Sequence, residues 1–124
     1  MDLFSVTSRD VRGGRVFTLF GELDLSSCQG LADELIGPPG SLVVIDLAQL
    51  TFLDSSGLGT IHRVRQRVIK DGGTLVLSRP QPNVQRVLEI TGLDGWVSDW
   101  DPEWADAATA ELLPDSVWDR STAQ

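Results

Sequence analysis

One segment of the chain joins an apolar strand to an amphipathic helix, and it limits the possible folds more than any other feature. Residues 42–45 (LVVI) are all apolar and indicate a strand. Further along, apolar residues recur at spacings of three and four, the period of a helix buried on one face. These residues are Leu58, Ile61, Val64 and Val68. A strand followed by such a helix is typical of a sheet with parallel strands and helices packed on it.

Further strands and helices alternate along the rest of the chain. Two strands joined by a Gly-rich turn predict an antiparallel hairpin, and the second of them carries apolar residues on both faces, so we expect it in the middle of the sheet. Strands are expected at residues 3–8, 15–20, 41–47 and 74–77, with a weak edge strand at Val97; helices are expected from Ser26 or Ser27 to residue 36, from Asp54 to residue 70, from Pro80 or Pro82 to Gly92, and over residues 101–113. The order ββαβαβα(β)α predicts an α/β protein with a mixed sheet of four to five strands and about four packed helices.

The size and charge of the chain bound its organisation and its partners. A length of 124 residues suits one domain; we expect residues 1–113 to form it and residues 114–124 to be a flexible tail. The formal net charge of −8 repels phosphate backbones and anionic lipids, so neither nucleic acid nor a membrane is an expected partner. No apolar run or N-terminal pattern indicates a membrane span or a signal peptide. With Cys28 as the only cysteine, no disulfide can form within the chain, which fits a cytoplasmic location.

The polar residues before the long helix form the main candidate site. A short apolar loop leads to Asp54, which lies where an N-cap belongs and can accept hydrogen bonds from the first turn. Ser55 follows at the positive end of the helix dipole, which tolerates an added phosphate; from position alone it is either a regulatory serine or an ordinary first-turn residue. Ser56 is interpreted as a capping residue. Gly57 either allows another backbone to approach or is an ordinary glycine, and Asp24 either caps the first helix or belongs to a binding surface.

Other chemistries lack the residues that they need. His62, the only histidine, lies seven residues after Ser55 on the same expected helix, too far to be the base of a catalytic triad. Neither neighbouring serine lies in a Gly-x-Ser-x-Gly elbow, and one His with one Cys is a poor supply of metal ligands. Arg63, Arg67 and Lys70 form a basic stripe on the expected helix, which we interpret as a solvated face. No residue pattern indicates a cofactor.

Four segments together resemble a known family. They are residues 21–24 (GELD), 52–59 (FLDSSGLG), 72–75 (GGTL) and 82–93, and they come in the same order and at compatible spacings. The span of about 110 residues from Phe4 to Leu113 resembles a STAS domain, and in particular a bacterial anti-sigma factor antagonist. The match is specific because the short Asp-Ser-Ser-Gly element is supported by three others.

The resemblance implies a STAS fold and a regulatory function without enzymatic activity. Proteins of this family bind an anti-sigma factor, itself a serine kinase with a GHKL-type ATP site, and thereby free a sigma factor. The kinase phosphorylates the serine that follows the aspartate of the motif, here Ser55; this weakens binding, and a serine phosphatase reverses it. The partner-binding residues that we expect are Asp24, Asp54, Ser55, Ser56, Gly57 and Leu58.

Two points stay open at this stage. The chain could instead be a STAS module without the switch, serving as a structural or interaction subunit of a stress-sensing or transporter-associated assembly. Tryptophans are frequent near the C-terminal end, at Trp96, Trp100, Trp104 and Trp118, and the resemblance implies nothing about their contacts.

Overall fold

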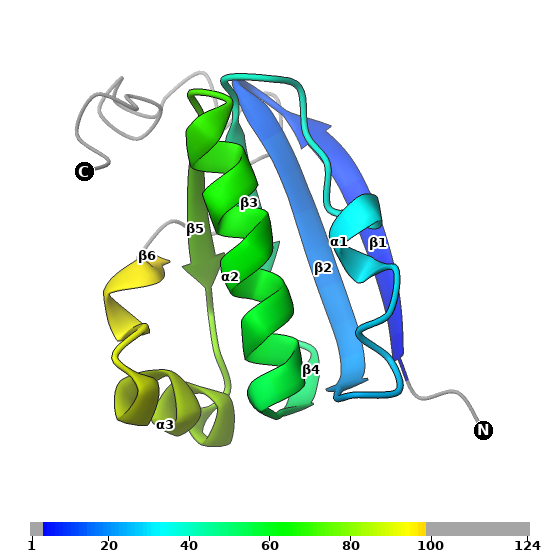
Figure 1. Cartoon of the computed structure of the whole chain (residues 1–124), viewed down its shortest axis with the longest axis vertical. Coiled ribbons are helices and arrows are strands. Elements are labelled where there is room, and N and C mark those ends of the chain that lie inside the picture. Colours follow the sequence, from blue (N-terminus) through cyan, green and yellow to red (C-terminus); the bar gives the residue numbers. More distant parts are fainter. Residues whose placement is uncertain (1–3, 99–124) are drawn as a thin grey trace.

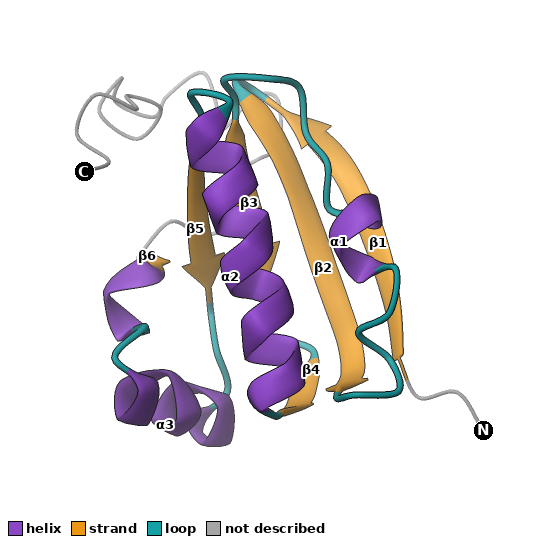
Figure 2. Cartoon of the chain, in the orientation of Figure 1, coloured by secondary structure: helices purple, strands orange, loops and turns teal. Residues whose placement is uncertain are grey.

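The protein has an α/β fold in which a β-sheet carries helices on one face. The structure, a computed structural model, describes residues 4–98. Its elements are β1 (Phe4–Val11), β2 (Gly14–Leu23), α1 (Leu31–Glu34), β3 (Leu42–Asp46), β4 (Leu50–Leu53), α2 (Ser55–Lys70), β5 (Thr74–Ser78), α3 (Pro82–Thr91), the 3-10 helix η1 (Asp94–Trp96) and β6 (Val97–Ser98). Helices α1 and α2 lie across the same face of the sheet, and α3 lies beside the end of α2 that follows β4 (Figure 1, Figure 2).

The sheet is mixed, as the sequence predicts. Its order is β1-β2-β3-β5-β6, and β4 pairs separately with β2. Only β1 and β2 are antiparallel; the pairs that involve β3, β4, β5 and β6 are all parallel. The central position expected for β2 is confirmed. The parallel strands therefore direct their carboxyl ends to one edge of the sheet, where α2 begins.

The hydrophobic core lies between the sheet and its helices. The stripe on α2 is buried as expected, and the core continues through Leu19 and Ile45 on the strands. A second, smaller cluster of Val16, Leu42 and Val44 lies on the opposite face of the sheet. Strands β2 and β3 thus carry buried side chains on both faces, which explains the adjacent apolar residues Val16 and Phe17 in β2 and the apolar run 42–45 in β3.

Two predictions about individual elements, the extent of the first helix and the loop at residues 50–53, are wrong for identifiable reasons. The first helix covers only Leu31–Glu34, because residues 25–27 form a turn and Gly30 takes a left-handed conformation with φ of 78° immediately before it. The segment 50–53, expected to be a loop, is strand β4, so the sheet formed within residues 4–98 has six strands instead of four or five. This strand has four residues and no alternating pattern, and periodicity could not reveal it.

The later elements agree more closely with the sequence. Helix α3 starts at Pro82, and Gly92 ends it with φ of 79°. The weak strand expected at Val97 is β6. The helix expected over residues 101–113 and the tail expected over residues 114–124 lie outside the described residues. Within residues 4–98 no helix is both long and apolar enough to cross a membrane.

Candidate functional site

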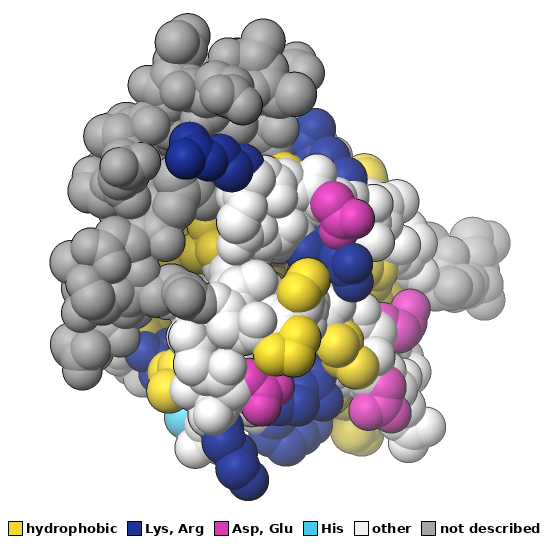
Figure 3. Space-filling model, turned by 90° about the horizontal axis from the view of Figure 1, so that it is seen from above, with side chains coloured by type: hydrophobic (Ala, Val, Ile, Leu, Met, Phe, Trp, Pro, Cys, Tyr) yellow, Lys and Arg dark blue, Asp and Glu magenta, His cyan; other side chains and the backbone are white. Residues whose placement is uncertain are grey.

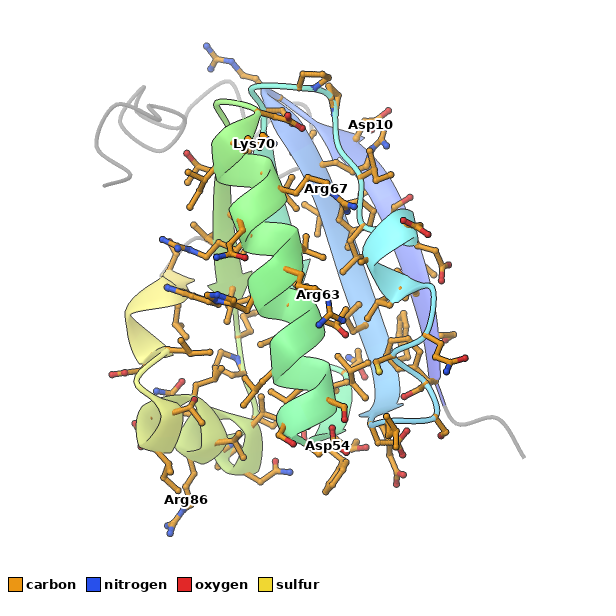
Figure 4. All side chains as sticks on the ribbon, in the orientation of Figure 1. Asp10, Asp54, Arg63, Arg67, Lys70 and Arg86 are labelled. Carbon is orange, nitrogen blue, oxygen red and sulfur yellow. The ribbon has the colours of Figure 1, made fainter. Side chains whose placement is uncertain are left out.

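The N-terminus of α2 is anchored by Asp54. The Asp54 backbone is extended, and one carboxylate oxygen accepts hydrogen bonds from the N–H groups of Ser56 at 2.9 Å and Gly57 at 3.0 Å. The Asp54 carbonyl accepts the first helical hydrogen bond, from Leu58 at 3.0 Å. This is the N-cap that the sequence predicts, and it satisfies amides that would otherwise lack a partner. In Figure 4, Asp54 lies at the beginning of α2 and Lys70 at its other end.

Strands β2 and β4 hold this cap in place. Leu23, the last residue of β2, pairs with Leu53, the last residue of β4, and the Asp54 N–H donates to the Leu23 carbonyl at 3.2 Å. The cap is therefore fixed by the sheet, and the orientation of the first helical turn follows from it.

Gly57 allows α2 to lie directly over these two strand ends. A Cβ atom at Gly57 would lie 2.7 Å from both Leu23 Cγ and Leu53 Cδ1, and 2.9 Å from the Leu23 carbonyl oxygen. The backbone that comes close is thus that of strand β2 in the same chain. Gly57 and Leu58 are both buried, so the structure gives both residues a packing role beneath the candidate surface.

The two serines after Asp54 differ in accessibility. Ser55 is exposed, whereas Ser56 is half-buried. The Ser56 N–H is bound to Asp54, and its carbonyl accepts from the hydroxyl of the buried Thr60 at 3.1 Å. Of these two serines, Ser55 is therefore the one whose hydroxyl another protein can reach more easily.

Asp24 organises a turn at the end of β2. Its Oδ1 accepts from the Ser26 hydroxyl at 2.8 Å, the Ser26 N–H at 3.0 Å, and both the N–H and the hydroxyl of Ser27 at 3.1 Å. The Ser26 hydroxyl and then the Ser27 amide lower the pKa of Asp24, so this carboxylate is charged at neutral pH. Asp24 thus caps this turn and not the first helix, which was one of the two roles that the sequence suggested for it.

The fold brings Asp24 and Asp54 to the same edge of the sheet. Each follows directly after one member of the paired residues Leu23 and Leu53. Residues 22–26 and 49–56 contain three carboxylates, with Glu22 as the third, and no Lys or Arg. At the opposite end of the molecule, Lys, Arg, Asp and Glu side chains are mixed (Figure 3). The two segments that flank the paired strand ends near Ser55 are therefore acidic, while Arg86 of α3 lies at the same end of the molecule as Asp54 (Figure 4).

Two exposed apolar side chains at this edge were missed by the sequence analysis. Leu25 is 68% exposed and Phe52 is 44% exposed. Leu25 follows Asp24, and Phe52 precedes Asp54 by two residues. For Leu25, the one signal in the sequence is an apolar residue within the otherwise polar segment 24–27. The exposure of Phe52 depends on the strand pairing and has no local signal.

The remaining candidates have structural contacts. His62 stacks on Trp96 with ring centroids 5.7 Å apart, and the Arg65 guanidinium lies 4.6 Å from the centre of the same indole. These contacts join η1 to α2. Of the basic stripe, Arg63 donates to Thr60, and Arg67 donates to the Ala32 carbonyl of α1. Among residues 4–98, no cluster of His, Cys, Asp and Glu is suited to hold a metal ion.

Known proteins match both the sequence and this fold. The STAS domain family model matches residues 6–110. An anti-sigma F factor antagonist from Lysinibacillus sphaericus is 33% identical over 95 residues, which cover 73% of this chain and 80% of the relative. An anti-sigma-B factor antagonist from Bacillus subtilis is 33% identical over 75 residues, 59% of this chain and 69% of the relative. The structure of the unphosphorylated anti-sigma factor antagonist SpoIIAA superimposes with a TM-score of 0.70 at 24% identity, covering 90% of this chain and 99% of SpoIIAA. The chain therefore belongs to the STAS-domain family of anti-sigma factor antagonists.

Proposed function

We propose that the edge around Ser55 binds an anti-sigma factor of the serine-kinase type and thereby frees a sigma factor. The observation that carries this proposal is an exposed serine on the first turn of a helix that Asp54 and two strand ends hold in place. The family to which the chain belongs and the names of its relatives support the choice of partner. The kinase phosphorylates Ser55, and a serine phosphatase restores the binding form.

The partner-binding residues divide into two groups under this proposal. Ser55, with the half-buried Asp24, Asp54 and Ser56, forms the surface that the partner contacts. The buried residues Gly57 and Leu58 act from below by holding the first turn of α2 against the sheet. Because these supports are part of the core, the surface is rigid before the partner arrives, which reduces the entropy lost on binding.

Phosphate is expected on Ser55 and on no other serine. A kinase must draw a hydroxyl into its own ATP site, and Ser55 is exposed whereas Ser56 is half-buried. Ser26 is also exposed, but its hydroxyl is hydrogen-bonded to Asp24. Fragment-ion mass spectrometry after incubation with ATP and the anti-sigma kinase locates the phosphate. Modification at Ser56 or Ser26 would contradict the assignment, and no transfer by any GHKL-type serine kinase of the source organism would contradict the kinase partnership.

Phosphorylation is expected to leave the fold nearly unchanged. The phosphate carries about −1.5 to −2 charges and lies at the positive end of the α2 dipole, while the Asp54 carboxylate opposes it. The two effects act in opposite directions and are each on the order of 1 kcal/mol, so they nearly cancel. Thermal melts followed by circular dichroism should agree within a few degrees for the two forms. A large decrease in Tm would indicate that the switch works by local unfolding.

A further inference from the structure

We propose that Leu25 and Phe52 are the apolar anchors through which the anti-sigma partner is held, in the same contact surface as Ser55. This inference rests on the proposed function, and it names the side chains that contribute most of the affinity for the anti-sigma partner. Both side chains are exposed in the free protein, at 68% and 44%. The paired strand ends Leu23 and Leu53 lead to Asp24–Leu25 on one side and to Asp54–Ser55 on the other.

Phe52 is turned outward by an irregularity in the sheet. Leu50 pairs with Gly21 and Phe52 pairs with Glu22, so Thr51 is an extra residue in β4. The strand consequently buries both Leu50 and Leu53 and exposes the two residues between them. Bulges of this kind re-aim side chains and are frequent beside functional sites.

Hydrogen bonds on both sides hold this irregularity. The Thr51 hydroxyl donates to the Gly21 carbonyl at 3.1 Å, and the Thr51 carbonyl accepts from the Asn83 side chain of α3 at 2.7 Å. Phe52 therefore stands on a backbone fixed to both β2 and α3. An aromatic side chain on a fixed backbone loses little freedom when a partner covers it.

Leu25 stands on an equally fixed turn. The Asp24 carboxylate binds Ser26 and Ser27, and the Asp24 carbonyl accepts from the N–H groups of Ser27 at 3.2 Å and Cys28 at 2.9 Å. The polar groups of Asp24, Ser26 and Ser27 thus hydrogen-bond to one another within the turn. The apolar side chain of Leu25 is left exposed to solvent. That arrangement supplies hydrophobic contact area at a defined position.

Charge decides which kind of partner fits the surface. Glu22 and Asp24 lie within three residues of Leu25 in sequence and Asp54 follows Phe52 by two residues, with no Lys or Arg in residues 22–26 and 49–56. A second copy of this chain would bring the same carboxylates together, and each copy has a net charge of −8. We therefore assign to the anti-sigma partner an apolar patch with Lys or Arg at its rim.

The test compares three serine substitutions of exposed apolar residues. Leu25→Ser and Phe52→Ser should each weaken binding of the anti-sigma kinase about ten- to one-hundredfold. Ile69→Ser is the matched control: Ile69 is 45% exposed and lies near the other end of α2, about 20 Å along the helix from Ser55. It should change affinity by less than about twofold, the expectation for an apolar side chain outside the interface. Calorimetric titration uses the purified kinase that phosphorylates the wild-type chain.

Further measurements distinguish the loss of a contact with the partner from damage to the fold and from failure of the proposed function itself. Phe52→Leu should restore most of the affinity lost in Phe52→Ser. The Tm of every variant should equal that of the wild-type protein, because the substituted side chains are exposed. Wild-type affinity in both Leu25→Ser and Phe52→Ser would overturn the inference and leave the proposed function standing. No binding by the wild-type chain would overturn both. A wild-type dimer in sedimentation experiments that Phe52→Ser dissociates would show that the occupant is a second copy, and would also overturn the inference.

Discussion

Phosphorylation of Ser55 should weaken binding of the anti-sigma kinase by at least about a hundredfold, equivalent to about 3 kcal/mol. The added group brings about −1.5 to −2 charges to an edge that already carries Glu22, Asp24 and Asp54. In a complex the phosphate would be partly desolvated, and an unpaired buried charge costs several kcal/mol on an order-of-magnitude scale. Calorimetric titration of the phosphorylated and unphosphorylated forms measures the difference.

Three variants resolve the physical origin of that loss. Ser55→Asp should weaken binding less than phosphate does, because it adds one charge on a shorter side chain. Ser55→Ala should bind as the wild-type protein does and resist regulation, because loss of a small exposed hydroxyl leaves no unsatisfied group. Ser56→Ala is the control for regulation, with the same chemistry one residue away in the contact surface: it should still be phosphorylated on Ser55 and still lose affinity when it is phosphorylated. Equal affinities for Ser55→Ala, Ser55→Asp and the phosphorylated form would place Ser55 outside the interface and favour the non-switching subunit.

Local signals predicted the part of the site that depends on neighbours in sequence. The N-cap at Asp54 and the buried stripe of α2 follow from residue type and spacing within one helix, and both are confirmed. Helix α3 is predicted for the same reason, with a start at Pro80 or Pro82 and an end at Gly92, and the structure begins it at Pro82. Such features depend on hydrogen bonds and packing between residues a few positions apart, which a sequence shows directly.

The features that the sequence did not reveal depend on pairing between distant segments. Strand β4 exists because it pairs with β2, thirty residues earlier, and its irregular register decides that Phe52 is exposed. The first helix is short because the Asp24 carboxylate closes a turn through Ser26 and Ser27, where a helix was expected. For Gly57 the sequence leaves open a close backbone approach or an ordinary glycine, and only the structure shows that the backbone of Leu23 lies close to it.

Gly57→Ala should be the most damaging single-methyl change at the site, lowering Tm by up to about 10 °C. Its Cβ would lie 2.7 Å from two core side chains and 2.9 Å from a backbone oxygen that the sheet holds in place. Overpacking of this kind costs about 1–3 kcal/mol, and alanine regains roughly 1 kcal/mol of helix propensity over glycine, which leaves a net loss of stability of up to about 2 kcal/mol. Relief of the clash must move the first turn of α2 away from β2 and β4.

Gly59→Ala is the matched control in the same helix and should have the opposite effect. A Cβ at Gly59 would meet only the end of the Arg63 side chain, at 3.6 Å, which is ordinary contact. The gain in helix propensity is then unopposed, so Tm should rise by a few degrees, on the scale of about 1 kcal/mol. Thermal melts of the two alanine variants and the wild-type protein make the comparison. A Gly57→Ala protein as stable as Gly59→Ala would mean that α2 does not need close contact with the strand ends, and that Gly57 serves the partner directly.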